Sequence, residues 1–260
     1  MSKEELELKL IYENPFHIKN IESPSLEMQL IAVKKNGSTI QYIKNPSIEV
    51  QKEAIKSNAY AIEYIIDPKE EIQILAVKSS WNALRYIKNS TDKVKSEAVG
   101  AKGWAIQFIK KPSEEIQIMA VKKDYDAIRY IEDPSEEVQL AAVNNYWAAI
   151  KYIKDPSISA QRAAIAQSEE AITYIDIYEE NKIKTFLQAN INILKYIYED
   201  VAEELVDEVL MDKFKDENID EKYVRDFLNL EILDMDKIEF IYNYGSKRAK
   251  QILIDYKLAI

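Results

Sequence analysis

The chain has 260 residues, 47% of them hydrophobic, and a formal net charge of −10. It has no cysteine and one histidine, His17, which excludes disulfides, thiol nucleophiles, cysteine zinc sites and most histidine-based catalysis. Four glycines form no phosphate-binding loop, and no apolar run reaches the roughly 18–20 residues of a membrane span. The first ten residues carry acids instead of a basic secretion signal, so we expect a cytoplasmic protein.

A 22-residue unit recurs without insertions over most of the chain. Its period is marked by Pro24, Pro46, Pro68, Pro112, Pro134 and Pro156, with Ser90 in the one internal slot that lacks proline. Residues 2–23 and 178–199 fit the same frame in degenerate form. A strict short period is typical of proteins whose units stack on their neighbours.

Each unit predicts two short helices. Asn45 or Asp133 could cap the first helix, with the following proline in its first turn. This helix buries an i, i+4, i+5 stripe, as at 50, 54 and 55. A polar turn such as Asn36-Gly37 leads to the second helix. Its expected core set in one repeat is Ala61, Ile62, Tyr64 and Ile65.

One unit cannot be stable alone, because its few apolar side chains stabilise less than ordering 22 residues costs. We therefore predict an all-α protein. Residues 1–199 should form an α-solenoid of eight to nine 22-residue helical hairpins, and residues 200–260 a helical acidic C-terminal cap.

The C-terminal region is strongly acidic: residues 199–239 hold 16 acids and 5 bases. Asn218 with Glu221 predicts a capping box, and Asp234 could cap the next helix. The acids could dock on a basic partner or imitate nucleic-acid charge, or they could form a solvated helix face. The candidate docking residues are Glu203, Glu204, Asp207, Glu208 and Asp212.

An aromatic series lies at the turn between the two helices. Its members are Tyr60, Trp81, Trp104, Tyr125 and Trp147. Three of these rings are followed at i+4 or i+7 by bases that an α-helix would place on the same face, namely Arg85, Lys88, Arg129, Lys151 and Lys154. Rings interleaved with cations suit stacking on bases or an anionic partner. The same rings could instead cover the edge of the next repeat.

A glutamine recurs once per unit, at Gln29, Gln51, Gln73, Gln117, Gln139 and Gln161. We expect a structural ladder in which each amide bonds the backbone of the neighbouring repeat, because buried polar groups need partners. The alternative is that the glutamines bind a ligand whose own structure repeats.

The run DPSEEVQLAAV, followed by AIKYIKDPS, resembles a helical-repeat family of unknown function seen in bacterial and phage proteins. The resemblance covers Pro24 to about Ile175 and departs at Ser90–Val99, where STDKVKSEAV replaces both the proline and the usual glutamine. Units of this kind are similar in construction to HEAT-like scaffolds. The family implies no activity, so no functional residue is carried over.

These patterns favour a non-enzymatic scaffold that binds a protein, with no cofactor, no metal and no membrane partner. Two alternatives stay open. One is single-stranded nucleic-acid binding along the Trp/Arg/Lys stripe. The other is a phage-type anti-defence inhibitor that meets a host nucleic-acid enzyme through its acidic C-terminal region. The partner's identity, the binding face and the oligomeric state do not follow from the sequence.

Overall fold

A computed structural model describes residues 2–177 and 179–258. Within these residues the protein is all-helical and has no strand, which confirms the predicted α-solenoid class. None of the described helices is long and apolar enough to cross a membrane. The chain divides into two compact units, Met1–Asp133 and Pro134–Ile260, and each is described separately.

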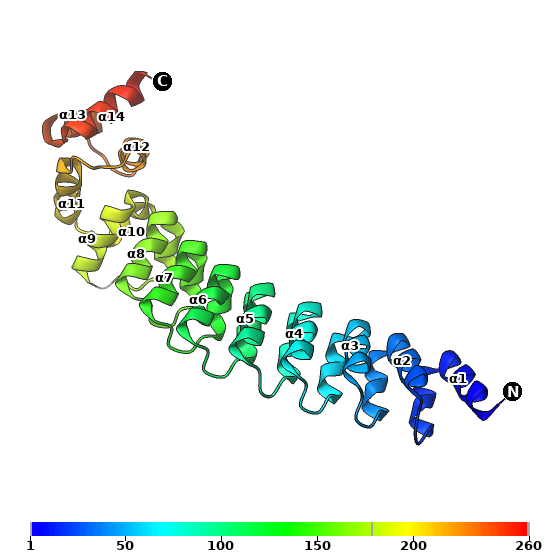
Figure 1. Cartoon of the computed structure of the whole chain (residues 1–260). Coiled ribbons are helices and arrows are strands. Elements are labelled where there is room, and N and C mark those ends of the chain that lie inside the picture. The colour runs from blue at the N-terminus through cyan, green and yellow to red at the C-terminus, as the bar shows by residue number, and fades with distance from the viewer. Residues whose placement is uncertain (1, 178, 259–260) are drawn as a thin grey trace. The chain divides into compact units, whose positions relative to one another are not determined.

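The first unit contains six repeats, each with one α-helix followed by one 3₁₀ helix. Neighbouring α-helices lie side by side in chain order (Figure 1). The elements are α1 (Lys3–Glu13), η1 (Pro15–Asn20), α2 (Leu26–Lys35), η2 (Gly37–Tyr42), α3 (Ile48–Ser57), η3 (Ala59–Tyr64), α4 (Glu70–Ser79), η4 (Trp81–Tyr86), α5 (Asp92–Ala101), η5 (Gly103–Phe108), α6 (Glu114–Lys123) and η6 (Tyr125–Tyr130).

The second unit contains three more repeats and the C-terminal helices. The repeat elements are α7 (Glu136–Asn145), η7 (Trp147–Tyr152), α8 (Ile158–Gln167), η8 (Glu169–Tyr174), α9 (Glu180–Ala189), η9 (Ile191–Ile193), α10 (Leu194–Ile197) and η10 (Tyr198–Asp200). The remaining helices are α11 (Glu203–Lys215), α12 (Glu221–Asn229), α13 (Lys237–Tyr244) and α14 (Lys247–Leu258).

In the first eight repeats the second helix is a six-residue 3₁₀ helix, not the predicted α-helix, and in the ninth it is replaced by η9, α10 and η10. Its bonds run from residue i to i+3, so one turn takes three residues and side chains three apart lie above one another. In η3 the core set is Ala61, Ile62 and Ile65, whereas Tyr64 lies at the surface with 41% of its area exposed. The prediction that Tyr64 fills the core was therefore wrong.

The α-helix caps differ from the expected ones. The residue before proline does not cap, because Asn45, Asp67, Lys111 and Asp133 have left-handed backbones with φ of 46° to 49°. The proline precedes the helix, and the serine or threonine after it is the N-cap in most repeats. Ser47, for example, accepts a hydrogen bond from Val50 N at 3.3 Å. This left-handed residue turns the chain from one repeat into the next.

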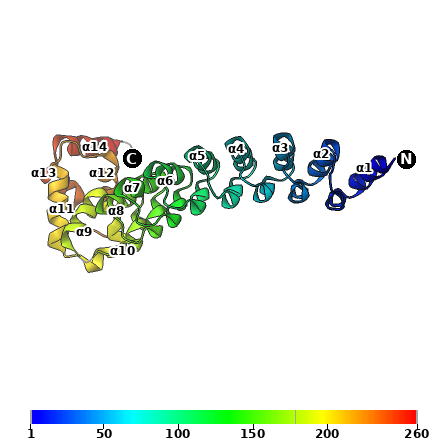
Figure 2. The same ribbon diagram turned by 60° about the horizontal axis from the view of Figure 1, so that its bottom comes forward.

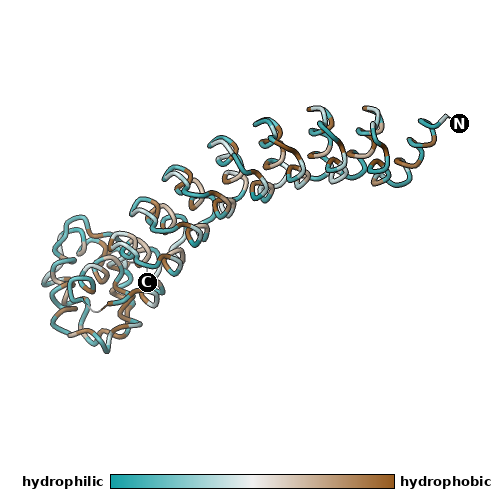
Figure 3. Tube along the Cα trace, turned by 90° about the horizontal axis from the view of Figure 1, so that it is seen from below, coloured by the Kyte–Doolittle hydropathy of each residue, from teal (hydrophilic) through white to brown (hydrophobic). Residues whose placement is uncertain are grey.

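Small side chains build the core of the repeats. Val50, Ala54 and Ile55 are fully buried in α3, and the equivalent residues recur in the following helices. Figure 3 shows hydrophobic residues returning in each repeat along the trace. In the degenerate first repeat Ile11 and Ile18 are buried, whereas Leu6 is exposed. In the ninth, Phe186, Leu187 and Leu194 are buried, so both terminal repeats keep the core frame.

The glutamine series is structural, but its partner is not the predicted one. Each Nε2 donates to the carbonyl of the proline five residues earlier in the same repeat, at 2.7 to 3.0 Å; the six donors are Gln29, Gln51, Gln73, Gln117, Gln139 and Gln161. Gln139 also reaches the next repeat, where its Oε1 accepts from Ser157 N at 2.8 Å. The amide therefore ties the start of each helix to its own proline.

Glycine lets two repeats approach closely at Gly37 and Gly103. A Cβ on Gly37 would lie 2.2 Å from Ala54 O, and one on Gly103 would lie 2.4 Å from Ala120 O. Their amides donate to the next repeat, Gly37 N to Ser57 Oγ at 3.1 Å and Gly103 N to Asp124 Oδ2 at 2.7 Å. Other repeats carry larger residues at this position, such as Trp81 and Tyr125.

The C-terminal helices close the end of the ninth repeat. Helix α11 packs on α9, and α12 packs on η9, while α13 and α14 pack on α11 and α12 (Figure 2). Tyr223 of α12 donates its hydroxyl to Leu187 O at 2.9 Å. The caps are Asp220 for α12 and Asp236 for α13, so the predictions of Asn218 and Asp234 were each two residues early.

The core of this C-terminal module is aromatic. Phe214 lies 4.8 Å from Phe227 and 5.7 Å from Phe240, measured between ring centroids. Phe214 and Phe227 are fully buried. Burial raises the pKa of the Tyr223 hydroxyl far above its ordinary value, and the Asp220 charge acts in the same direction. The C-terminal module therefore has a separate core, which is built from aromatic rings.

Candidate interaction surface

The 3₁₀ helices carry the aromatic residues that the sequence singled out. Trp81, Tyr125 and Trp147 are the first residue of their 3₁₀ helix, whereas Tyr60 and Trp104 are the second. Where the first position holds Ala59 or Gly103, the ring occupies the second. The expected single aromatic slot is therefore two adjacent positions, and each helix from η3 to η7 carries a ring at one of them.

Four of these rings, those of Tyr60, Trp81, Trp104 and Trp147, each reach a ring at the end of the next 3₁₀ helix. In the first unit, Tyr60 meets Tyr86 edge-on with centroids 5.9 Å apart. Trp81 stacks on Phe108 at 6.2 Å, and Trp104 meets Tyr130 edge-on at 6.4 Å. In the second unit, Trp147 lies 6.4 Å from Tyr174. The rings thus cover the edge of the following repeat, as one of the two interpretations expected.

Sequence reasoning missed the second half of this array. An aromatic residue ends every 3₁₀ helix from η2 to η8, and the set is Tyr42, Tyr64, Tyr86, Phe108, Tyr130, Tyr152 and Tyr174. None of them belongs to the buried core, and Tyr42 and Tyr64 are 41% exposed while Tyr174 is 52% exposed. The signal was visible as an invariant 22-residue period, but hydrophobicity placed these rings inside. We call the two sets of rings, with the adjoining bases, the aromatic surface.

Tyr64 differs from the other terminal rings. The preceding repeat holds Gly37 and Ser38 in the two ring positions, so it offers no aromatic partner. Among the described residues, no aromatic ring pairs with Tyr64. Its ring is 41% exposed and makes no ring-to-ring contact between repeats in the described part of the chain.

The bases do not align with the rings as predicted. A residue four positions on is turned by about 120° in a 3₁₀ helix, and Lys88 and Lys154 lie beyond the ends of η4 and η7. Arg85 instead lies over its neighbour Tyr86 at 4.8 Å from the ring centroid, and Lys151 lies over Tyr152 at the same distance. These two cations therefore contact the aromatic residue that ends their own 3₁₀ helix, and not the ring near its start.

Trp104 is fixed in place by acids of the next repeat. Its Nε1 donates to Asp126 Oδ1 at 2.7 Å, and Arg129 lies 3.8 Å from the same carboxylate. Lys102 lies 5.0 Å from the Trp104 ring centroid and bonds Asp124 at 2.7 Å. Polar contacts therefore join repeats five and six, and the Asp126 carboxylate balances the charge of Arg129.

The acidic docking residues lie on α11. Its buried face holds Leu205, Val206 and Leu210, among others, so the acids at 203, 204, 207, 208 and 212 are exposed. Glu208 forms an ion pair with Lys184 of α9, and both of its carboxylate oxygens accept hydrogen bonds from Lys184 Nζ, at 2.9 and 2.8 Å. One of the five acids thus holds the module on the ninth repeat, and the others form a solvated face.

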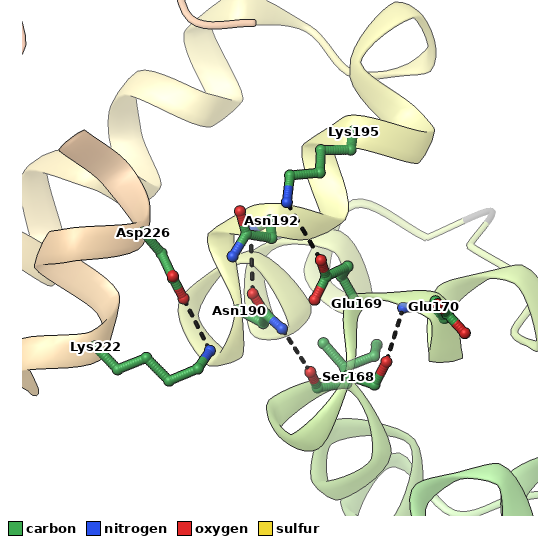
Figure 4. A network of polar contacts seen from close by, with 9 residues as sticks. Ser168, Glu169, Glu170, Asn190, Asn192, Lys195, Lys222 and Asp226 are labelled. Atoms are coloured by element: carbon green, nitrogen blue, oxygen red, sulfur yellow. Dashed lines mark hydrogen bonds and ion pairs between the residues drawn. The ribbon is translucent and has the colours of Figure 1, made fainter. Parts of the chain in front are cut away.

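A polar network lies where the last repeats meet α12 (Figure 4). Asn190, which is buried, donates to Ile165 O at 2.9 Å and accepts from Asn192 N at 3.1 Å. Lys195 binds Glu169 at 3.2 Å. Burial raises the pKa of Glu169, but bonds from its own backbone N–H and from Lys195, with the charges of Lys195 and Lys222, lower it overall.

Within 2–177 and 179–258, no three His, Cys, Asp or Glu side chains are placed to hold a metal ion. His17 is half-buried in η1, with its Nδ1 3.5 Å from Asn20 Nδ2. That contact is a local one within a single 3₁₀ helix.

Comparison with family models, curated proteins and solved structures gives no match to this chain. The resemblance of its repeat pattern to a bacterial and phage family therefore stays a prediction.

Proposed function

We propose that this protein is a non-enzymatic scaffold that binds a protein partner on the aromatic surface of its 3₁₀ helices. The supporting observation is that, within each unit, the 3₁₀ helices from η2 to η6 and from η7 to η8 end on an aromatic residue outside the core. Leaving a large aromatic surface in contact with water is unfavourable compared with covering it. Tyrosine, tryptophan and arginine also contribute most of the binding energy at protein interfaces. In the first unit, Tyr64, Arg85 and Tyr86 supply this composition on adjacent repeats.

The opposite side of the first unit has a different character. The α-helices carry ion pairs between repeats, such as Lys52 with Glu71 at 2.8 Å and Lys78 with Glu97 at 3.4 Å. Exposed pairs of this kind contribute at most about 1 kcal/mol and keep the charges hydrated. We therefore assign partner binding to the 3₁₀ helices instead of the α-helices.

Tyr64 is the position that tests this proposal best. Trp81 stacks on Phe108, so its removal would weaken the repeat array as well as any binding. Tyr64 lacks a ring partner, so Tyr64→Ala should leave folding nearly intact. A photo-crosslinking amino acid at Tyr64 should capture one discrete protein from a lysate of the source organism. The same group at Lys56, which is exposed at the end of α3, should not.

The captured protein should then bind the Tyr64→Ala chain at least about tenfold more weakly, a typical loss at an interface hot spot. Equal capture at positions 64 and 56, or unchanged affinity of the variant, would reject the proposal.

Single-stranded nucleic acid is the second candidate, because Arg85 and Lys151 each lie over a tyrosine ring. It predicts a salt-dependent shift of a labelled oligonucleotide that Arg85→Glu abolishes. Absence of a shift at low salt would remove it. The anti-defence alternative uses the exposed acids of α11, and it predicts that Asp207→Lys with Asp212→Lys abolishes inhibition of the host enzyme.

A further inference from the structure

The C-terminal module contains a pocket that neither the repeats nor the closing contacts require. It has a volume of about 300 Å³ and lies between α12, the segment before α13, α13 and α14. Since α11 and α12 make the contacts with the ninth repeat, α13 and α14 form the second layer of the module. A pocket of this size is at the lower end of the range of small-molecule sites.

The walls of the pocket are mainly apolar. They are formed by Leu228, Met235, Ile238 and Leu253. Ile238, the second residue of α13, is 44% exposed, whereas Phe240 and Ile241 of the same helix are buried. An apolar ligand body would take this wall out of water and gain about 25 cal/mol for each Å² buried.

The charged groups of the pocket have a net preference for an anion. Lys237 and Lys257 line it together with the Tyr256 ring and Asp236. The Asp236 carboxylate already accepts two backbone amides of α13, from Ile238 N at 3.1 Å and Glu239 N at 2.9 Å. Its charge is therefore offset by the positive end of the helix.

The two lysines differ in how they are held. Lys237 donates to the carbonyls of Leu228 and Leu230 at the end of α12, so its ammonium group is fixed beside the pocket. Lys257 is exposed near the end of α14. That helix carries Lys247, Arg248, Lys250 and Lys257 against the single acid Asp255, which reverses the acidic character of residues 199–239.

We propose that this pocket binds a small anionic amphiphile, with a compact apolar body against Leu228, Met235, Ile238 and Leu253 and a carboxylate or sulfonate beside Lys257. The site is independent of the aromatic surface. Its charge selects the anion, and its volume limits the body to about three aromatic rings or a short branched chain.

The test uses two probes of nearly equal shape. 8-Anilinonaphthalene-1-sulfonate carries the anion, and N-phenyl-1-naphthylamine is its neutral counterpart. Both are titrated into the full chain labelled with ¹³C at the methionine methyl groups. Met235 lines the pocket, whereas Met28 and Met119 lie in the repeats and serve as internal controls. The anionic probe should shift the Met235 methyl signal with saturation at one molecule per chain, and should leave Met28 and Met119 unchanged.

The variants separate charge from shape. Lys257→Glu should weaken the anionic probe about tenfold, the effect of reversing one charge at short range in a half-solvated site. It should change the neutral probe less than about twofold. Lys247→Glu reverses a charge on the same helix away from the pocket, and it should leave both affinities unchanged.

Two results would overturn the assignment. In one, the anionic probe shifts Met28 or Met119 as much as Met235, or never saturates. In the other, the two lysine variants weaken the anionic probe equally, which would mean that only the general charge of α14 attracts it. The unshifted methyl signals of each variant show that the chain is still folded.

Discussion

The repeats and the C-terminal module place their aromatic residues in opposite ways. In the first eight repeats the core is mainly alanine, valine and isoleucine, and the aromatic surface lies outside it on the 3₁₀ helices. In the module Phe214, Phe227 and Phe240 meet in the centre. Close stacking of short helices needs small residues between backbones, whereas four helices that meet at varied angles leave a wider space that rings fill. The repeat aromatics are therefore free to serve a second purpose.

The largest expected contrast comes from removing one ring in each region. Phe227→Ala should destabilise the module by about 3–5 kcal/mol, because a fully buried ring leaves a cavity. Tyr64→Ala removes a half-exposed ring with no ring partner and should cost less than about 1 kcal/mol. Hydrogen exchange measured by mass spectrometry resolves the two regions. Equal loss of protection in both would mean that the repeat rings are core residues after all.

A smaller contrast separates two glycines within the fifth repeat. Gly103→Ala places a Cβ 2.4 Å from Ala120 O and should cost about 1–3 kcal/mol. Gly100 lies in α5 with open space around its missing Cβ, so Gly100→Ala should stabilise by about 1 kcal/mol through helix propensity. Urea unfolding followed by tryptophan fluorescence measures both. If the two variants shift the midpoint in the same direction, the close approach at Gly103 is not real.

The turn between repeats offers a gain of similar size. Lys111 has a left-handed backbone with φ of 49°, where three other repeats have asparagine or aspartate. Those residues tolerate this region better, so Lys111→Asn should stabilise by about 0.5–1 kcal/mol. Lys110→Asn, one residue earlier and exposed, is the matched control and should have almost no effect. An unchanged midpoint for Lys111→Asn would argue against a strained turn.

The smallest effect concerns pH at the contact between the last two repeats, where Glu169 binds Lys195. The folded pKa of Glu169 lies below its ordinary value of 4.5, so folding gains stability from it above that value and loses it as pH falls through the folded pKa. Glu169→Gln should flatten the dependence of stability on pH between about pH 5 and pH 3. Thermal unfolding across this range checks it, with the exposed Glu170→Gln as control. An identical slope for both variants would contradict the interaction with Lys195.

The sequence predicted the repeat class and the first helix well. Val50, Ala54 and Ile55 repeat at spacings that only a helix brings to one face, and burial confirms them. The second helix was harder, because its apolar residues at 61, 62 and 65 fit either a 3.6-residue or a 3.0-residue turn over so short a segment. Once the α-form was assumed, the alignment of Trp81 with Arg85 and Lys88 followed and was wrong.

Tertiary geometry decided the remaining details. Tyr64 was placed in the core because it follows the apolar period, although its position faces solvent. Gln51 could reach a backbone carbonyl in its own repeat or in the next, and the sequence gives no measure of that distance. The pocket beside Lys257 joins residues up to 29 positions apart along the chain, between Leu228 and Lys257, and no local pattern indicates it.

The most direct measurement of the account is the affinity of the crosslinked partner for the wild-type chain and for Tyr64→Ala, set beside the unfolding midpoints of the two proteins. We expect midpoints that agree within experimental error and an affinity reduced by about tenfold or more. An equal affinity with equal midpoints would show that the Tyr64 ring takes no part in binding. A parallel fall in both quantities would show that the ring holds the repeats together.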